Sequence, residues 1–359
     1  MKDPKILIIG AGPTGLTAAL RLAQNGIFAD IVEKRAEPSQ LSRAVGIMPE
    51  SLDKLGDSVK RRIMGEGYPF RKIKVHVDRN LVLSLDTSNG LKTSEVMIGL
   101  PQNRTEEIIA AEFEKLGGKV AYGAAVFEIT ATDDSAEVRL EGEEEVRTYD
   151  WVIACDGVKS TVRRQLGIPY PGYDLGEKWS IADIDLAGEN DSEMINVWVN
   201  LGENNDVIIS LPIGENRFRL VSSTKDSIAT LPLSVKIANI RREGTFSLAV
   251  RQVEQYKHGR VLLAGDAAHC HSPVGGKGMN LGIDDAVAAA DAVLHDTTDE
   301  YSAGRHKVGK QVIYATESVR KRIMSENPIT EIVIKTVFGV VDKSDFLQRK
   351  IMQKLSKLT

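Results

Sequence analysis

The chain has 359 residues, long enough for two or three domains and a sizeable core, and its composition is that of an ordinary soluble globular protein. Lys and Arg total 46 against 50 Asp and Glu, so the net charge of −4 provides no overall basic field and argues against nucleic-acid partners.

Cysteine usage and hydropathy set a further limit on the class of protein. The two cysteines, Cys155 and Cys270, make no disulfide framework, which is typical of a reducing compartment. The apolar run near the start is too short for a signal peptide, and no stretch of about 18 apolar residues appears. We therefore expect a cytoplasmic protein with no integral membrane span.

The first strong pattern lies at the N-terminus. Residues 6–9, ILII, form a continuous apolar run, as expected for a strand buried on both faces of a parallel sheet. The glycine-rich run GAGPTG follows at residues 10–15. Residues 16–26 then show helical spacing and end at a glycine, and a second strand, FADIVE, covers residues 28–33. The order is strand, glycine turn, helix, strand and acid.

Each part of this order suits a dinucleotide. Gly10 permits a tight turn, Gly12 lets a pyrophosphate approach the backbone, and Gly15 lets the helix pack closely on the sheet. Glu33 is placed to accept hydrogen bonds from a ribose hydroxyl. An acid at this position favours FAD or NAD over NADP.

Two further apolar runs end in an Asp paired with a Gly. WVIACDGVKSTVR at residues 151–163 contains Asp156-Gly157, and RVLLAGD at residues 260–266 ends in Gly265-Asp266. Open α/β sheets bind ligands at the carboxyl ends of their strands, so both pairs are candidates for the same site. The alternative interpretation is two ordinary turns, because Asp and Gly are common turn residues.

At this point the sequence resembles a known family. The glycine fingerprint at 10–15, Asp156-Gly157 with Ser160 and Arg163, GDAAH at 265–269 and HSPVGGKGMN at 271–280 resemble the signatures of the FAD-dependent aromatic hydroxylases. These are class A flavoprotein monooxygenases of the p-hydroxybenzoate hydroxylase type, and the phenol and polyketide hydroxylase branch is the most similar. The resemblance implies an α/β fold with a Rossmann-like FAD-binding domain and parallel sheet, an inserted mostly antiparallel substrate sheet and a C-terminal helical segment.

The motifs and the resemblance together nominate the cofactor residues. The candidates for FAD binding are Gly10, Gly12, Pro13, Thr14, Gly15, Glu33, Lys34, Arg43, Gln102, Asp156, Gly157, Gly265, Asp266, Pro273, Gly276, Gly278, Met279 and Asn280. The resemblance places Pro273 and His271 near the flavin face, but no residue is nominated as catalytic because the cofactor carries the chemistry. Lys277 stands where the related branch more often has Gln.

The segment around Cys270 also allows two other hypotheses. His269 and His271, two residues apart, are able to reach one metal ion from an extended segment, and Cys270 is a potential nucleophile. Neither arrangement has a third partner at sensible spacing, so we predict no metal site and a structural cysteine.

Alternating apolar residues indicate a second kind of sheet. Residues 71–77 and 81–86 predict an antiparallel hairpin, and four alternating segments between 179 and 223 predict a sheet with one face over the flavin. Its candidate substrate residues are Trp198, Arg217 and Arg219, with Tyr170 and Tyr173 nearby. Each is also explained as sheet packing or surface charge.

The predicted domains interleave along the chain. The FAD-binding domain takes residues 1–68, 99–175 and 253–296, the substrate domain takes 69–98 and 176–252, and C-terminal helices take 297–359. The last helix is basic and amphipathic, and we expect it to pack on its own domain in preference to a membrane surface.

The predicted function is that of an FAD-dependent monooxygenase. The resemblance implies NADH or NADPH as a transient electron donor, O2, and hydroxylation of a phenolic or polycyclic aromatic substrate through a flavin C4a-hydroperoxide. An FAD-dependent reductase or oxidase of the same fold, and a non-catalytic redox sensor or accessory flavoprotein, remain alternatives. The Trp-x-Trp-x-Ile-Pro motif of flavin halogenases does not occur. The sequence does not decide whether the electron donor is NADH or NADPH, or whether the protein is a monomer or a homodimer.

Overall fold

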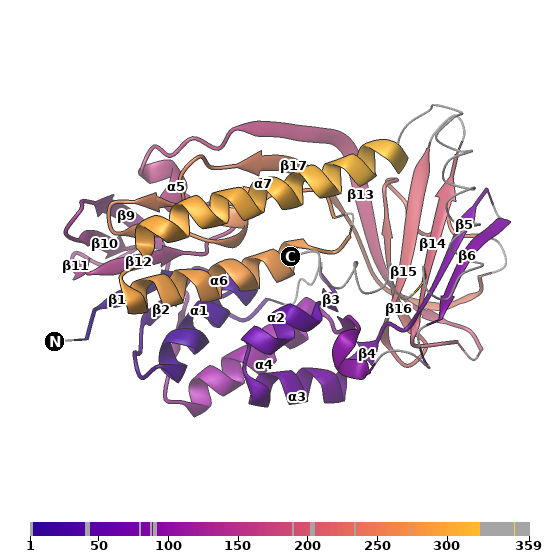
Figure 1. Ribbon diagram of the computed structural model, residues 1–359, viewed down its shortest axis with the longest axis horizontal. Coiled ribbons are helices and arrows are strands. Elements are labelled where there is room, and N and C mark those ends of the chain that lie inside the picture. The colour runs from indigo at the N-terminus through magenta and orange to yellow at the C-terminus, as the bar shows by residue number, and fades with distance from the viewer. Residues whose placement is uncertain are drawn as a thin grey trace.

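The computed structural model describes residues 3–39, 44–78, 80–86, 88, 92–188, 190–201, 205–232, 235–273, 275–323 and 348. Within these residues a six-stranded sheet with its helices lies beside an eight-stranded sheet (Figure 1). Two long strands, β13 (Gly172–Leu186) and β17 (Ile237–Gln252), extend between the two parts. The expected combination of a parallel and a mostly antiparallel sheet is confirmed.

The six-stranded sheet is formed by the apolar runs of the sequence. Its order is β18-β19-β12-β1-β2-β8, and all neighbours are parallel except β18 with β19. The strands are β1 (Ile6–Ile9), β2 (Asp30–Glu33), β8 (Val120–Tyr122), β12 (Trp151–Ala154), β18 (Lys257–His258) and β19 (Val261–Leu263). The strands β1, β12 and β19 are fully buried because helices cover the sheet.

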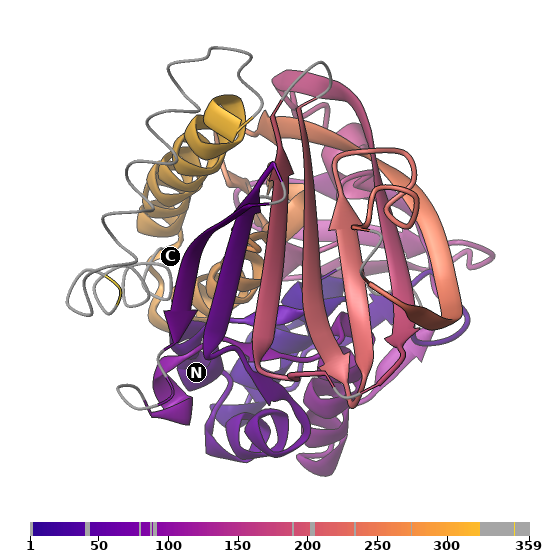
Figure 2. The ribbon, with the colours of Figure 1, turned by 90° about the vertical axis from the view of Figure 1, so that its right-hand side faces the viewer.

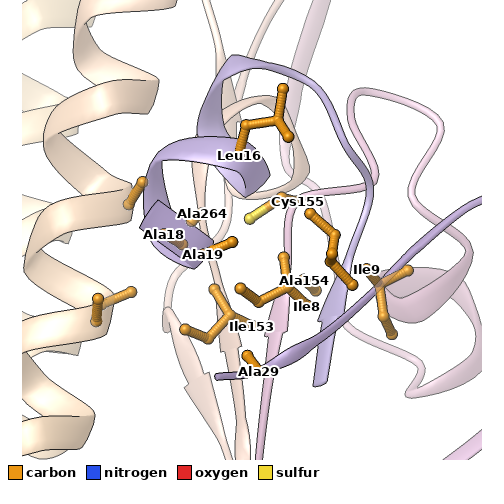
Figure 3. Packing of buried hydrophobic residues seen from close by; sticks show 14 of the residues in the cluster. Ile8, Ile9, Leu16, Ala18, Ala19, Ala29, Ile153, Ala154, Cys155 and Ala264 are labelled. Atoms are coloured by element: carbon orange, nitrogen blue, oxygen red, sulfur yellow. The ribbon is translucent and has the colours of Figure 1, made fainter. Parts of the chain in front are cut away.

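Helices α1 (Pro13–Gln24), α4 (Gln102–Lys115) and α6 (Gly278–His295) pack together on this sheet. Small side chains allow the close packing: Ala18 and Ala19 of α1 lie over Ile8 and Ile153 of the strands (Figure 3). The first turns of α1 and α6 both lie at the edge of the sheet where its parallel strands end, which is the edge used for ligands in open α/β folds.

Smaller elements surround this core. Between β8 and β12 the chain forms the antiparallel sheet β9 (Val126–Ala131), β10 (Ala136–Leu140) and β11 (Val146–Tyr149). A second small sheet contains β3 (Gly46–Ile47), β4 (Tyr68–Pro69) and β7 (Ile98–Gly99), and short helices are α2 (Pro49–Lys54), α3 (Asp57–Glu66) and α5 (Thr161–Gln165).

The eight-stranded sheet has the order β20-β17-β13-β16-β15-β14-β5-β6. Its other strands are β5 (Lys72–Val77), β6 (Asn80–Asp86), β14 (Met194–Asn200), β15 (Asp206–Gly214), β16 (Arg217–Ser222) and β20 (His269–Cys270). The predicted hairpin therefore exists, and it joins the sheet through β5, which runs parallel to β14 (Figure 2). The domain boundaries themselves stay a prediction.

The C-terminal part that the structure describes is mainly one helix. α7 (Thr298–Ile323) lies along α6 and contacts β17 (Figure 1). The rest of the predicted C-terminal helical region, including the basic amphipathic helix, lies outside the described residues except for residue 348. Within the described ranges, no helix is both long and apolar enough to cross a membrane.

Candidate active site

A cavity of about 1200 Å³ lies between the two sheets. Its walls come from the carboxyl ends of β1, β2 and β12, the segment 270–279, the inner face of the eight-stranded sheet and one side of α7. The volume exceeds the range of roughly 300–1000 Å³ that is usual for one small molecule. The space suits a dinucleotide together with a second ligand.

The glycine turn after β1 forms the floor of this cavity. Gly10 has a φ of +103°, and its amide donates to the Val32 carbonyl at 2.8 Å. A Cβ on Gly15 would lie 1.8 Å from the Gly10 carbonyl oxygen, so Gly15 serves the packing of α1 on the turn. Gly12 differs, because it lines the cavity and, apart from its two chain neighbours, no atom of the described residues lies within 4 Å of the position of its Cβ.

The N-terminus of α1 opens toward the same space. Gly12 is the N-cap, no side chain caps the helix, and Pro13 and Thr14 also line the cavity. Free amides at a helix N-terminus, together with the helix dipole, form a site for an anion such as a pyrophosphate. The space left open beside Gly12 is where such a group fits.

Glu33 ends β2 inside the cavity wall and is 6% exposed. Its carboxylate accepts hydrogen bonds from the Ala11 amide at 2.9 Å and from the amide and side chain of Arg35 at 3.0 Å. Burial alone raises the pKa of the Glu33 carboxyl, but the hydrogen bonds from Arg35 and Ala11 outweigh it and hold the pKa below its ordinary value. Glu33 is therefore an ionised acceptor for ribose hydroxyls.

A second buried carboxyl, Glu106 of α4, lies in the same wall and was not singled out by the sequence motifs. Its side chain accepts a hydrogen bond from Gln102 at 2.8 Å. Burial raises the pKa of Glu106 to about 7, although the Gln102 bond and the Arg35 charge oppose the rise. Glu106 therefore titrates near neutral pH.

The Glu106 carboxyl predicts a pH dependence of stability. Because its pKa is higher in the folded chain than in the unfolded one, the folded state binds the proton more tightly, and this contribution is lost as the pH rises from about 4.5 to 7. We expect the FAD-free protein to lose on the order of 2 kcal/mol over that range from this group, and Glu106→Gln to remove the loss. Urea unfolding at pH 5 and pH 8 measures it. Glu107→Gln, at the neighbouring 40%-exposed side chain, is the control, and an equal effect there would contradict the assignment.

Asp156 follows β12 and also lines the cavity. Its Oδ2 accepts from the amides of Thr161 and Val162 at 2.6 and 3.2 Å, and so it holds the start of α5. Its Oδ1 is buried, and no hydrogen-bond partner exists for it among the described residues. A hydroxyl of a bound ligand would satisfy this atom. Gly157, next to it, has a φ of +80° and lines the same wall.

The Gly265-Asp266 turn is held from below by a buried ionic network. The Gly265 amide donates to Asp285 at 3.0 Å, and the same carboxylate binds His269 and Arg305, each at 2.5 Å. Asp266 lines the cavity, whereas Gly265 and His269 lie behind the wall. Burial raises the pKa of Asp285, but the His269 and Arg305 charges outweigh it and hold the pKa below its ordinary value.

The segment 271–280 forms the middle of the cavity. Pro273, Gly276, Gly278 and Met279 line it, as expected for cofactor residues. Asn280 does not line it, because its amide donates to the carbonyls of Gly46 and Gly276 and its oxygen accepts from the Met48 amide at 2.8 Å. Asn280 thus fixes the shape of the loop from behind.

Two side chains of this loop, Lys277 and His271, place nitrogen atoms in the cavity wall. Lys277 is 6% exposed, and burial lowers its pKa to about 8, against the opposing charges of Glu50 and Asp284. His271 bonds the Ser272 carbonyl through Nδ1 at 2.8 Å, and burial lowers its pKa to about 4. At neutral pH His271 is therefore uncharged, with Nδ1 as the donor.

The metal and thiol hypotheses receive no support. No group of three metal-ligand side chains occurs in the part of the chain that the structure describes. His269 binds Asp285 while His271 faces the cavity, so the two rings serve different purposes. Burial raises the pKa of the Cys270 thiol, which disfavours the thiolate that a nucleophile requires.

The three predicted substrate residues lie outside the cavity wall, so the structure corrects that expectation. Trp198 points to the opposite face of β14, where it stacks on His76 with ring centroids 5.9 Å apart. Arg219 is 1% exposed and bound to Asp183 at 2.7 Å, and Arg217 is paired with Asp185 at 3.2 Å.

The tyrosines also have other partners. Tyr170 donates to the Asp266 carbonyl at 3.0 Å, and Tyr173 bonds Glu317 of α7. The wall of the described cavity consists mainly of apolar side chains at alternating strand positions, which the sequence analysis did not nominate. Its members are Phe70, Ile73, Val75, Leu83, Leu85, Ile181, Ile195, Val197, Ile209, Leu211, Val221, Phe246 and Leu248.

Most of the nominated cofactor residues thus meet around one space. Gly10, Gly12, Pro13, Thr14, Glu33, Lys34, Gln102, Asp156, Gly157, Asp266, Pro273, Gly276, Gly278 and Met279 line it. Gly15, Gly265 and Asn280 support the wall, and Arg43 lies outside the described residues. Arg35, Glu95 and Glu106 are charged lining residues that the sequence did not nominate.

The protein has a parallel sheet with a glycine turn and an acidic residue, Glu33, placed for a ribose, and a second sheet joins it over one cavity. These features define a dinucleotide-binding flavoprotein. The family model described as "FAD binding domain" matches residues 3–316, and the chain belongs to this family. FAD is therefore the dinucleotide, and the resemblance to the FAD-dependent aromatic hydroxylases is confirmed by relatives that are monooxygenases.

The rifampicin monooxygenase of Streptomyces venezuelae (strain ATCC 10712) is 28% identical over 99% of this chain and 78% of its own length. The 6-methylpretetramide 4-monooxygenase of Streptomyces rimosus is 27% identical over 98% of this chain and 68% of its own. Among solved structures, p-nitrophenol 4-monooxygenase from Pseudomonas putida DLL-E4 matches with a TM-score of 0.85, 22% identity and coverage of 100% and 99% of the two chains, which shows a shared fold.

Proposed function

We propose that the protein is an FAD-dependent monooxygenase that uses NADH or NADPH and O2 to hydroxylate a phenolic or polycyclic aromatic substrate. The observation that carries the proposal is the continuity of the cavity. It runs from the dinucleotide end, at Gly12 and Glu33, to an apolar chamber beneath the eight-stranded sheet. A cofactor and an aromatic ring would therefore share one continuous space. The relatives named above are monooxygenases of rifampicin and of 6-methylpretetramide, which supports the same reaction type.

The residues of the dinucleotide end bind and orient the cofactor. The free amides at the start of α1 would hold the pyrophosphate, and the ionised Glu33 would accept a hydrogen bond from a ribose hydroxyl. Asp156 and Asp266 present carboxylates to the hydroxyls of the ligand. Bound FAD supplies the redox chemistry that ordinary side chains lack.

The loop and the sheet prepare the space for the reaction. Lys277 and the N-terminus of α6 put positive charge beside the cavity, where negative charge on a reduced cofactor is stabilised. The apolar wall of the sheet excludes water and holds the ring in place. The uncharged His271 remains able to hold a substrate hydroxyl without adding charge.

The test is turnover of the FAD-loaded protein with NADH or NADPH in the presence of phenols and hydroxylated polycycles. We expect at least one aromatic compound to accelerate consumption of the nicotinamide cofactor and to yield a hydroxylated product that contains oxygen from isotopically labelled O2. Release of hydrogen peroxide alone with every compound would favour a reductase, an oxidase or a non-catalytic flavoprotein. Failure to bind FAD would overturn the proposal entirely.

A further inference from the structure

The sheet end of the cavity is built almost entirely of hydrocarbon. Successive wall positions alternate along the strands, as in Ile195 and Val197 of β14 and Ile209 and Leu211 of β15, so the same face of each strand meets the cavity. Other strands of the same sheet extend this face with Phe246 and further apolar residues. A ligand against this wall makes dispersion contacts and loses the water around it.

The two arginines that the sequence nominated as substrate residues, Arg217 and Arg219, are already paired with carboxylates of β13. Arg219 binds both oxygens of Asp183, at 2.7 and 2.8 Å, and its side chain is 2% exposed. Arg217 and Arg241 both bind Asp185. Drawing Arg219 onto a substrate anion would leave Asp183 buried without its partner, which is strongly unfavourable.

Charged side chains of the cavity wall gather at its other end and on the loop in its middle. Lys34 and Arg35 follow β2, Asp156 follows β12, and Lys277 lies on the loop before α6. Among the described residues, the charged lining residue at the sheet end is Glu95, an exposed carboxylate whose sign repels an anion. A carboxylate directed at the sheet would therefore lose its hydration and gain no cation from the described part of the wall.

We propose that this enzyme selects aromatic rings that carry no ionised group on the edge facing the sheet, and that it rejects carboxylated rings. The inference rests on the proposed function, since it concerns the substrate end of the same cavity. The apolar wall is the element that discriminates. The uncharged phenol or polycycle is the class of substrate that fits it.

Matched pairs of ligands test this selection on the FAD-loaded protein. The first pair is 4-hydroxybenzoate and its methyl ester, and the second is 6-hydroxy-2-naphthoate and its methyl ester. Within each pair the ring and the hydroxyl are the same, and the ionised carboxylate is the difference. We expect each ester to perturb the absorbance of the bound flavin with an affinity at least about 100-fold tighter than that of its acid.

A substitution in the wall provides the reciprocal test. Val197→Arg places a cation on the apolar face and is expected to improve binding of the two acids relative to the esters by about tenfold or more. Val197→Met, which changes size without charge, is the control. The flavin spectrum and the melting temperature of both variants establish that the fold and the bound FAD are retained.

The outcomes separate this inference from the proposed function. Bound FAD with equal affinities within each pair, or with no response to any of the four ligands, would overturn the selection and leave the flavoprotein assignment intact. A tight acid complex that disappears in Lys277→Gln would also overturn it, because Lys277 would then be an anchor for carboxylates. Loss of FAD from the wild-type protein would contradict the proposed function instead.

Discussion

Replacing Gly12 by valine is expected to lower the affinity for FAD by on the order of 100-fold while the protein remains folded. Apart from its two chain neighbours, the Cβ position of Gly12 has no atom of the described residues within 4 Å, and its φ of −80° is accessible to any residue. The new side chain would enter the cavity, where the close approach of a pyrophosphate to the α1 amides leaves it no room. Fluorescence titration of the FAD-free protein with FAD measures the affinity.

Two other glycines provide the controls. Gly65, within α3 and outside the cavity, also has open space at its Cβ, so Gly65→Val should leave FAD affinity unchanged. Gly15→Ala should instead destabilise the fold itself, because its Cβ would lie 1.8 Å from the Gly10 carbonyl oxygen. Wild-type affinity in Gly12→Val would refute the assignment of this turn to the cofactor.

The glycine turn that contains Gly12 and Gly15 shows which part of the fold is determined by local sequence pattern. The run Ile6–Ile9, the turn and α1 follow from apolar continuity and glycine spacing, and all three occur as predicted. The alternation in residues 71–77 likewise predicts β5. However, the parallel pairing of Val75 with Val197 joins segments more than one hundred residues apart, and no local pattern contains that choice of partner.

The candidate site shows the same division. Motif residues such as Glu33 and Asp266 line the cavity because the turn that contains each motif has a nearly fixed shape. Arg219 was misjudged because the sequence displays a charge and not its partner, which is Asp183 on the neighbouring strand. A polar residue of the sheet was taken for a ligand contact, whereas apolar residues of the same sheet line the ligand space.

The cavity wall also depends on residues that never reach the cavity. Asp285 is 1% exposed, and it receives the Gly265 amide, the His269 ring and the Arg305 guanidinium. These three groups come from a turn, a short strand and α7, so one carboxylate joins the FAD turn to the helix that covers it. Groups of opposite charge around Asp285 compensate for the free-energy cost of burying its carboxylate.

Replacing Asp285 by alanine is therefore expected to cost about 3–5 kcal/mol of unfolding free energy, since it leaves Arg305 without its buried partner. The stability that Asp285 contributes is present at neutral pH and is lost as the pH falls below the ordinary range of aspartate, because its pKa is depressed in the folded chain. Urea unfolding at pH 7 measures the cost. Asp291→Ala, on the same helix but paired with Arg21 near the surface, should cost no more than about 1 kcal/mol. If Asp285→Ala and Asp291→Ala lost similar amounts of unfolding free energy, the Asp285 network would not be what holds the Gly265-Asp266 turn. In that case the two variants should also bind FAD with equal affinity.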